Sequence, residues 1–76
     1  YQLPSIQHII GSISAKELTS VIQQLPTGYR IIFNMYELEG YSHKEIAQKL
    51  NISIGTSKSQ LSKAKKLLRY RIEQLF

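Results

Sequence analysis

Lysine and arginine gather in one short stretch near the carboxyl end of the chain. Between residues 58 and 71 stand six of the ten basic residues, with no acid among them: Lys58, Lys63, Lys65, Lys66, Arg69 and Arg71. Solubilising helices usually intersperse glutamate for i,i+4 pairing, whereas like charges at this spacing repel one another. A polyanion would relieve that repulsion, so the cluster favours nucleic-acid binding over a merely solvated surface.

The same stretch separates into two faces when it is drawn as a helix at about 100° per residue. Its apolar ladder consists of Ile54, Leu61, Ala64, Leu68, Ile72 and Leu75. The opposite face carries basic and hydrogen-bonding side chains, namely Lys58, Ser59, Ser62, Lys63, Lys66, Arg69 and Tyr70. This pattern predicts a helix that rests on a core with one face and enters a DNA groove with the other.

The polar face divides into candidates for reading bases and candidates for positioning on the backbone. Early in the helix, where side chains reach base edges, stand Lys58, Ser59, Ser62 and Lys63. A lysine on guanine O6 and N7 contributes about 1–3 kcal/mol of discrimination, whereas each serine is equally well explained as an exposed residue. Candidates for phosphate contacts are Lys65, Lys66 and Arg69, the helix start at Ser42, His43 and Lys44, and Thr56, which alternatively caps its helix.

A shorter helix and a tight turn precede this basic helix. The shorter helix begins at an S-x-x-E capping box, in which Ser42 and Glu45 satisfy orphan amides. Its apolar face holds Ile46, Ala47 and Leu50. Asn51 stands in the turn, where the backbone of many helix-turn-helix units needs a positive φ that asparagine tolerates. The spacing therefore predicts a helix-turn-helix whose recognition helix begins near Gly55.

Two more helices are predicted upstream. Another S-x-x-E box at Ser14 opens a helix that ends at a proline, and its buried stripe is expected to be Leu18, Val21, Ile22 and Leu25. The next helix spans about residues 27–38, and its candidates for burial are Ile31, Ile32, Met35 and either Phe33 or Tyr36. Gly40 fits the left-handed position past its end. We therefore expect an all-α, four-helix domain over residues 14–76, a winged-helix-like core without strands, after a lead-in at residues 1–13.

Composition excludes several classes of protein. A chain of 76 residues makes one domain, and without cysteine it contains neither a disulfide framework nor a zinc finger. No apolar run approaches the ~20 residues that span a bilayer. Neither histidine has a partner at motif spacing, and there is no phosphate-cradling glycine loop. We therefore predict no enzyme, metal site or cofactor. Because the chain begins at Tyr1 rather than methionine, we expect it to be part of a longer protein.

Three linked motifs resemble region 4 of bacterial RNA polymerase sigma factors, most closely those of the extracytoplasmic-function type. The motifs are Leu25-Pro26-x-x-Tyr29-Arg30-x-x-Phe33, then Glu39-Gly40-Tyr41-Ser42-His43-Lys44-Glu45-Ile46-Ala47, then Ile52-Ser53-x-Gly55-Thr56-Ser57-Lys58-Ser59-Gln60-Leu61-Ser62-Lys63-Ala64-Lys65. The resemblance covers about residues 14–72. It implies a cytoplasmic, nucleoid-associated bacterial domain that binds the −35 promoter element as double-stranded DNA, contacts the β-flap of the polymerase core and directs transcription initiation.

The resemblance also implies roles for particular residues. It turns Lys58, Ser59, Ser62 and Lys63 toward the bases and places Arg30, Ser42, His43 and Lys44 near the sugar-phosphate backbone. Anti-sigma factors mask such domains in many family members, and Leu67 and Tyr70 are candidate contacts for such a partner.

Two departures from the family pattern stand out. Ser57 occupies a position where the family commonly has a buried valine, so we expect a slightly more polar core there. Lysines replace several arginines on the DNA face. Because lysine lacks the planar two-pronged contact of arginine, we expect a looser sequence preference.

Two alternatives remain open on the sequence. A LuxR-type response-regulator output domain shares the E-I-A-x-x-L core, but that group dimerises through its last helix and lacks the L-P-x-x-Y-R-x-x-F entry. A helical protein-interaction module would dock its basic helix on an acidic partner and would not bind duplex DNA at moderate salt.

Overall fold

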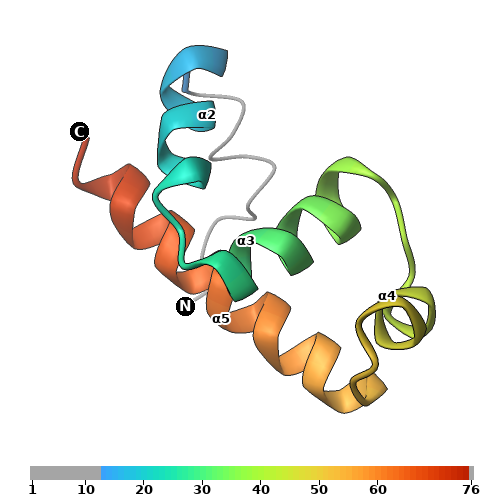
Figure 1. Cartoon of the computed structure of the whole chain (residues 1–76). Helices are drawn as coiled ribbons and strands as arrows, with labels where there is room; N and C mark the ends of the chain where they lie inside the picture. Colours follow the sequence, from blue (N-terminus) through green and yellow to red (C-terminus); the bar gives the residue numbers. More distant parts are fainter. Residues whose placement is uncertain (1–12, 76) are drawn as a thin grey trace.

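The fold is a set of helices arranged around one long carboxyl-terminal helix (Figure 1). The structure, a computed structural model, describes residues 13–75 of the chain. In this part the elements are α2 (Ala15–Gln23), α3 (Thr27–Phe33), the π-helix η1 (Asn34–Leu38), α4 (His43–Leu50) and α5 (Ile54–Glu73). Because η1 continues α3 directly, the described residues form the four helices without strands that the sequence predicts. Most of the predicted lead-in, residues 1–12, lies outside the described part.

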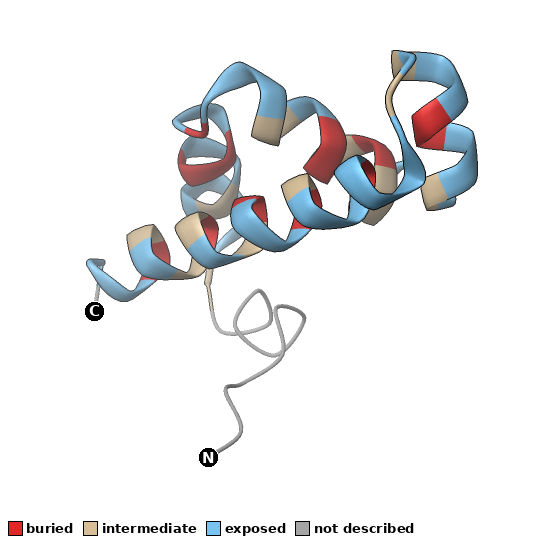
Figure 2. Cartoon of the chain, turned by 90° about the horizontal axis from the view of Figure 1, so that it is seen from below, coloured by how far each residue is buried: buried red, intermediate tan, exposed pale blue. Residues whose placement is uncertain are grey.

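Helix α5 is the element against which α2, α3 and α4 all pack. In Figure 1, α2 lies beside the carboxyl-terminal end of α5, and α4 lies beside its beginning. Along α5, buried and exposed stretches alternate (Figure 2), and the core consists of buried apolar residues from every helix. They are Val21, Ile22, Leu25, Ile32, Phe33, Met35, Ile46, Ala47, Leu61, Ala64, Leu68 and Ile72. The apolar ladder of α5 therefore forms the centre of the core, as its period predicts.

Capping bonds set the starts of α2 and α4. At α4, Glu45 N donates to Ser42 Oγ at 3.1 Å and Ser42 N donates to Glu45 Oε1 at 3.0 Å, which confirms the reciprocal capping box. At α2, Glu17 N also donates to Ser14 Oγ, at 3.1 Å. The Glu17 carboxylate, however, accepts from the Ser14 hydroxyl at 2.7 Å. The first box thus differs from the expected reciprocal pattern, because the carboxylate bonds the side chain of the cap rather than its amide.

The turn between α4 and α5 has the expected conformation but a different cap. Asn51 adopts the left-handed conformation with φ 56° and ψ 49°. Gly40, in the turn that precedes α4, also has a positive φ of 80°, as predicted. Thr56 N donates to Ser53 Oγ at 2.9 Å, so Ser53 caps α5. The interpretation of Thr56 as the cap is therefore wrong, and α5 begins at Ile54, one residue before the expected start.

The π-helix is the feature that the sequence pattern did not predict. In η1, Glu39 N donates to Asn34 O at 2.9 Å, five residues back, and Tyr41 N donates to Met35 O at 2.9 Å. A wider turn admits one more residue than an α-helical turn and rotates the side chains that follow. Within η1, Tyr36 is half-buried and stacks on His43 of α4.

Three expectations about burial are wrong. Ile31 is 41% exposed, because Ile32 and the fully buried Phe33 occupy the inward face of α3. Ile54 and Leu75, the two ends of the predicted ladder, are also exposed: Ile54 is the first residue of α5, and Leu75 lies beyond its last residue, Glu73.

Candidate nucleic-acid interface

The outer face of α5 brings together the residues predicted to read bases. Lys58, Ser59, Ser62 and Lys63 are exposed within the first turns of the helix. Ser57, Leu61 and Ala64, which alternate with them along the chain, are buried. The core therefore fixes the rotation of α5 about its axis and leaves the predicted readers exposed.

The beginning of α4 lies beside the beginning of α5 and adds backbone donors to this face. The first i→i−4 bond of α4 joins Ile46 N to Ser42 O, so the N–H groups of His43 and Lys44 precede the bonded part of the helix. Lys44 is exposed. The Ser42 hydroxyl accepts from Glu45 N and serves as the cap. This helix start combines amide donors, a positive helix dipole and a lysine, which suits a phosphate group.

His43 has neighbours on two other elements. Its ring stacks on Tyr36 of η1 with centroids 4.5 Å apart and planes inclined by 23°. Its Nδ1 lies 2.9 Å from Oγ of Ser57 on α5, a side chain with no exposed surface. The sequence predicts His43 as a phosphate contact, and the structure adds two partners within the protein. The signal that could have revealed this pair was Ser57, because a buried hydroxyl in an apolar ladder requires a hydrogen-bond partner.

The surroundings of His43 favour its neutral form. Partial burial, and then the positive charges of Lys58 and Lys65, lower the pKa of His43 below 6.5. In the free domain these surroundings favour the neutral imidazole, in which one of the two nitrogens is an acceptor.

Lys65 lies on the side of α5 that faces η1. Its Nζ lies 2.6 Å from Oε1 of Glu37 and 5.7 Å from the centroid of the Tyr36 ring. This lysine, predicted as a phosphate contact, thus holds η1 against α5.

Three other predicted phosphate contacts have partners within the protein. Arg30 Nη1 donates to Gln23 O, near the end of α2, at 3.0 Å. Thr56 Oγ1 accepts from the Ser53 hydroxyl at 2.8 Å. Arg69 Nε lies 3.8 Å from Glu73 Oε1, one turn further along α5. Lys66 is exposed and continues the outer face beyond Lys63.

The expected contact surface of Leu67 and Tyr70 divides between core and solvent. Leu67 is half-buried and packs against the core, whereas Tyr70 is 60% exposed. Only Tyr70 is therefore presented openly from this pair.

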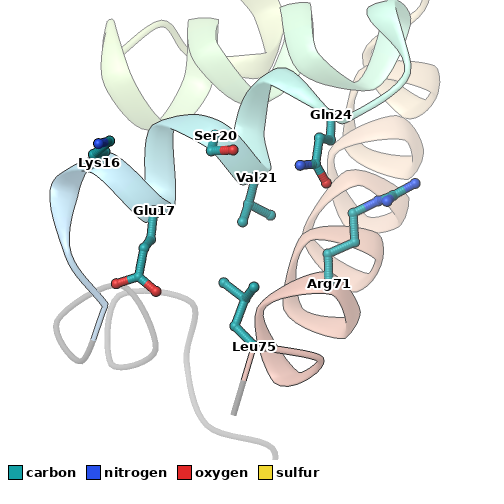
Figure 3. A pocket seen from close by; sticks show the side chains of 7 residues that line it. All are labelled: Lys16, Glu17, Ser20, Val21, Gln24, Arg71 and Leu75. Atoms are coloured by element: carbon teal, nitrogen blue, oxygen red, sulfur yellow. The ribbon is translucent and has the colours of Figure 1, made fainter.

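Elsewhere, an open cleft separates α2 from the end of α5 (Figure 3). Its volume of about 270 Å³ is below the range usual for pockets that hold drug-sized ligands. Among residues 13–75, no cluster of three or more histidine, cysteine or acidic side chains could hold a metal ion. No helix in the same part is both long and apolar enough to cross a membrane.

A helix-turn-helix whose second helix exposes lysine and serine side chains is the architecture of a DNA-binding domain. Residues 15–68 match the family model of sigma-70 region 4, and the chain belongs to this family. The chain is also similar to RNA polymerase sigma factor SigZ of Bacillus subtilis (strain 168), at 29% identity over 79 residues. That similarity covers 93% of this chain and 45% of the relative.

The chain thus spans less than half the length of this curated relative. No solved structure matches it significantly. The family match and the relative confirm the resemblance to region 4 of an extracytoplasmic-function sigma factor that the sequence motifs indicated.

Proposed function

We propose that this domain binds the −35 promoter element as the region 4 module of a bacterial sigma factor. The observation that carries the proposal is the exposed row of Lys58, Ser59, Ser62 and Lys63 on the second helix of a helix-turn-helix. At 1.5 Å per residue the 20-residue helix α5 is about 30 Å long. Only its first turns are needed in a major groove, and these are the turns that carry the row.

Phosphate contacts on either side of the groove complete the proposed interface. On one side the start of α4 offers the amides of His43 and Lys44 together with the Lys44 ammonium. Further along α5, Lys66 and Arg69 reach the backbone beyond the bases. We assign Lys65 and Arg30 to holding the fold, because each is held by a close partner within the protein, whereas the contact of Arg69 with the exposed Glu73 is longer, at 3.8 Å.

In its parent protein we expect the domain to act without catalysis, in the bacterial cytoplasm. It would contact the β-flap of the polymerase core and direct transcription initiation. An anti-sigma factor is a further candidate partner, and Tyr70 is the exposed candidate contact. These proposals follow from membership of the sigma-70 region 4 family.

The test is selection of short duplexes from a randomised pool by the 76-residue chain, followed by fluorescence anisotropy across a salt series. The proposal predicts enrichment of one asymmetric site of about half a helical turn, with affinity that falls steeply with salt. Enrichment of a palindrome would instead favour the response-regulator type of domain, because a symmetric site reflects a symmetric dimer.

A failure to bind any duplex at low salt would contradict autonomous DNA binding. A pull-down with the isolated β-flap would then distinguish the remaining possibilities. Capture by the flap would assign the domain to polymerase binding, and no capture would favour a module that binds a different acidic protein.

A further inference from the structure

We propose that His43 is a positioning residue for the recognition helix and that it takes up a proton when the domain binds duplex DNA. The inference rests on the DNA-binding function proposed above. It concerns a side chain at the junction of the two helices of the helix-turn-helix, where both meet η1.

His43 contacts both neighbouring elements, η1 and α5. It is the first residue of α4, its ring stacks on Tyr36 of η1, and its Nδ1 lies 2.9 Å from Ser57 Oγ in the first turns of α5. Ser57 is immediately followed by Lys58 and Ser59, two of the proposed readers. A bond at Ser57 therefore fixes the start of the recognition helix relative to the phosphate-binding start of α4.

A serine hydroxyl can keep this bond in both protonation states of the imidazole. Against neutral Nδ1 the hydroxyl of Ser57 donates, and against a protonated Nδ1–H its oxygen accepts. In the second case its hydrogen can turn to the carbonyl oxygen four residues back, as helical serines commonly do. That carbonyl belongs to Ser53, which already accepts from Ser57 N at 3.0 Å. A valine at this position would hold His43 in neither state.

The charges around His43 disfavour protonation in the free protein. Lys58 and Lys65 of α5 repel a second positive charge, and so does the dipole at the start of α4. The acids nearby are already engaged, Glu37 of η1 by Lys65 and Glu45 of α4 by Ser42. The other groups in contact with the ring are the Tyr36 ring of η1 and the Ser57 hydroxyl of α5, and Lys44 is the exposed next residue of its own helix.

Binding of a duplex reverses this electrostatic preference for the neutral imidazole. Phosphates at the start of α4 and along α5 bring negative charge close to His43 and offset the two lysines, so the bound state favours the imidazolium. Because the bound domain then holds more protons than the free domain, DNA affinity rises as the pH falls. One proton allows an increase of up to about tenfold per pH unit between the free and bound pKa values of His43.

The experiment measures duplex affinity by anisotropy between about pH 7.5 and pH 5.5 at constant ionic strength, around the ordinary pKa of histidine. The wild type is compared with His43→Asn, whose amide can still bond Ser57 but does not titrate. We expect the wild type to bind more tightly as the pH falls and the variant to bind equally well at every pH. His8→Asn changes the other histidine, which lies outside the described residues. This variant should show the same pH dependence of duplex affinity as the wild type.

The positioning role has its own comparison at pH 7.5. His43→Ala removes the bond to Ser57 and should weaken duplex binding about two- to tenfold, the range of one net hydrogen bond. His43→Asn should lose less affinity than His43→Ala there, because its amide can still bond Ser57, and circular dichroism confirms that both variants are folded.

Each outcome bears on the proposal. Proton uptake at His43 would be overturned if the duplex affinity of His43→Asn still rose as the pH fell, or if the affinity of the wild type did not change with pH. Either result would leave DNA binding itself intact. Equal losses in His43→Ala and His43→Asn at pH 7.5 would overturn the positioning role. A wild type that binds no duplex at any pH would overturn both the inference and the function on which it rests.

Discussion

At the scale of single residues, Ser57 combines full burial with a polar hydroxyl. Such a group costs stability unless it is bonded, and His43 supplies the bond from the neighbouring helix. The serine that replaces the family's usual valine therefore exchanges apolar packing for a directional contact. That contact links the recognition helix to the start of α4, which valine packing alone would not do.

The two kinds of lysine on the outer face should be separable by mutation. Lys58→Ala removes a proposed base contact and should change the ranking of sites, with an effect of about 1–3 kcal/mol at the preferred base pair. Lys66→Ala removes a proposed phosphate contact and should weaken all sites alike, reducing the salt slope by about one ion. Anisotropy on a panel of single-base variants of the selected site measures both effects. If both variants weakened every sequence equally, the division between reading and positioning would be wrong.

Lys65 should contribute to stability rather than to DNA affinity. Its partner Glu37 has a side chain only 12% exposed, whereas the Lys65 side chain is 34% exposed. Lys65→Met should lower the free energy of unfolding by about 1 kcal/mol, because the partly solvated pair is lost and a nearly buried carboxylate remains. Lys66→Met, its exposed neighbour, should stay within about 0.5 kcal/mol of the wild type. Urea unfolding measures the difference, and equal stabilities of the two variants would contradict this role.

At the scale of elements, η1 contacts both helices of the helix-turn-helix through its side chains. Tyr36 stacks on His43 of α4, and Glu37 pairs with Lys65 of α5. One irregular turn thus supports both helices of the helix-turn-helix. This agrees with the frequent occurrence of π-helical turns at functional sites.

The capping box of α4 should make stability depend on pH. Hydrogen bonding from the Ser42 amide and then the Ser42 side chain, with a smaller effect of Lys49, lowers the pKa of Glu45 below 4.5 despite slight desolvation. Because the folded pKa is the lower one, this stabilisation is present above pH 4.5 and is lost as the pH falls through the folded value.

The matched variant is Glu45→Gln, which keeps an acceptor for the Ser42 amide but cannot ionise. The wild type should be more stable than the variant at neutral pH, and the difference should shrink toward zero in acid. Chemical unfolding at several pH values measures it. A difference that stays constant from neutral to strongly acidic pH would mean that the charge of Glu45 has no part in the cap.

At the scale of the whole molecule, the net charge of +5 opposes folding and favours DNA binding. Most of this charge lies along α5, where successive basic residues are at most five positions apart, about 7.5 Å of helix rise. This spacing is shorter than the Debye length of about 10 Å at 0.1 M salt. Raising sodium chloride from about 20 to about 300 mM should therefore increase the melting temperature by a few degrees. The same change should weaken duplex binding, because releasing each counterion into a more concentrated salt solution gains less entropy.

Calorimetry measures the expected rise in melting temperature with salt, and anisotropy on the same preparation measures the expected fall in duplex affinity. Lys63→Gln, which lowers the net charge by one at an exposed position, should show a smaller rise in melting temperature. A melting temperature that does not change with salt would show that repulsion along α5 is already balanced by the acids of the other helices.

The sequence alone determined the features that depend on residues within one or two helical turns. The Ser42–Glu45 box, the left-handed Asn51 and Gly40, the buried ladder from Leu61 to Ile72 and the outward row at residues 58–63 are all local. Each follows from helical period or from the chemistry of a cap. Family membership followed from the same motifs.

The tertiary structure decided which side chains meet across helices. His43 and Ser57 are 14 positions apart, and Glu37 and Lys65 come from different elements. Their encounter depends on the π-helical turn and on how α4 and η1 cross α5. The exposure of Ile31, Ile54 and Leu75 likewise depends on where the covering helices end. Periodicity states which face of a helix is apolar, but only packing determines how much of that face is covered and which polar groups find partners.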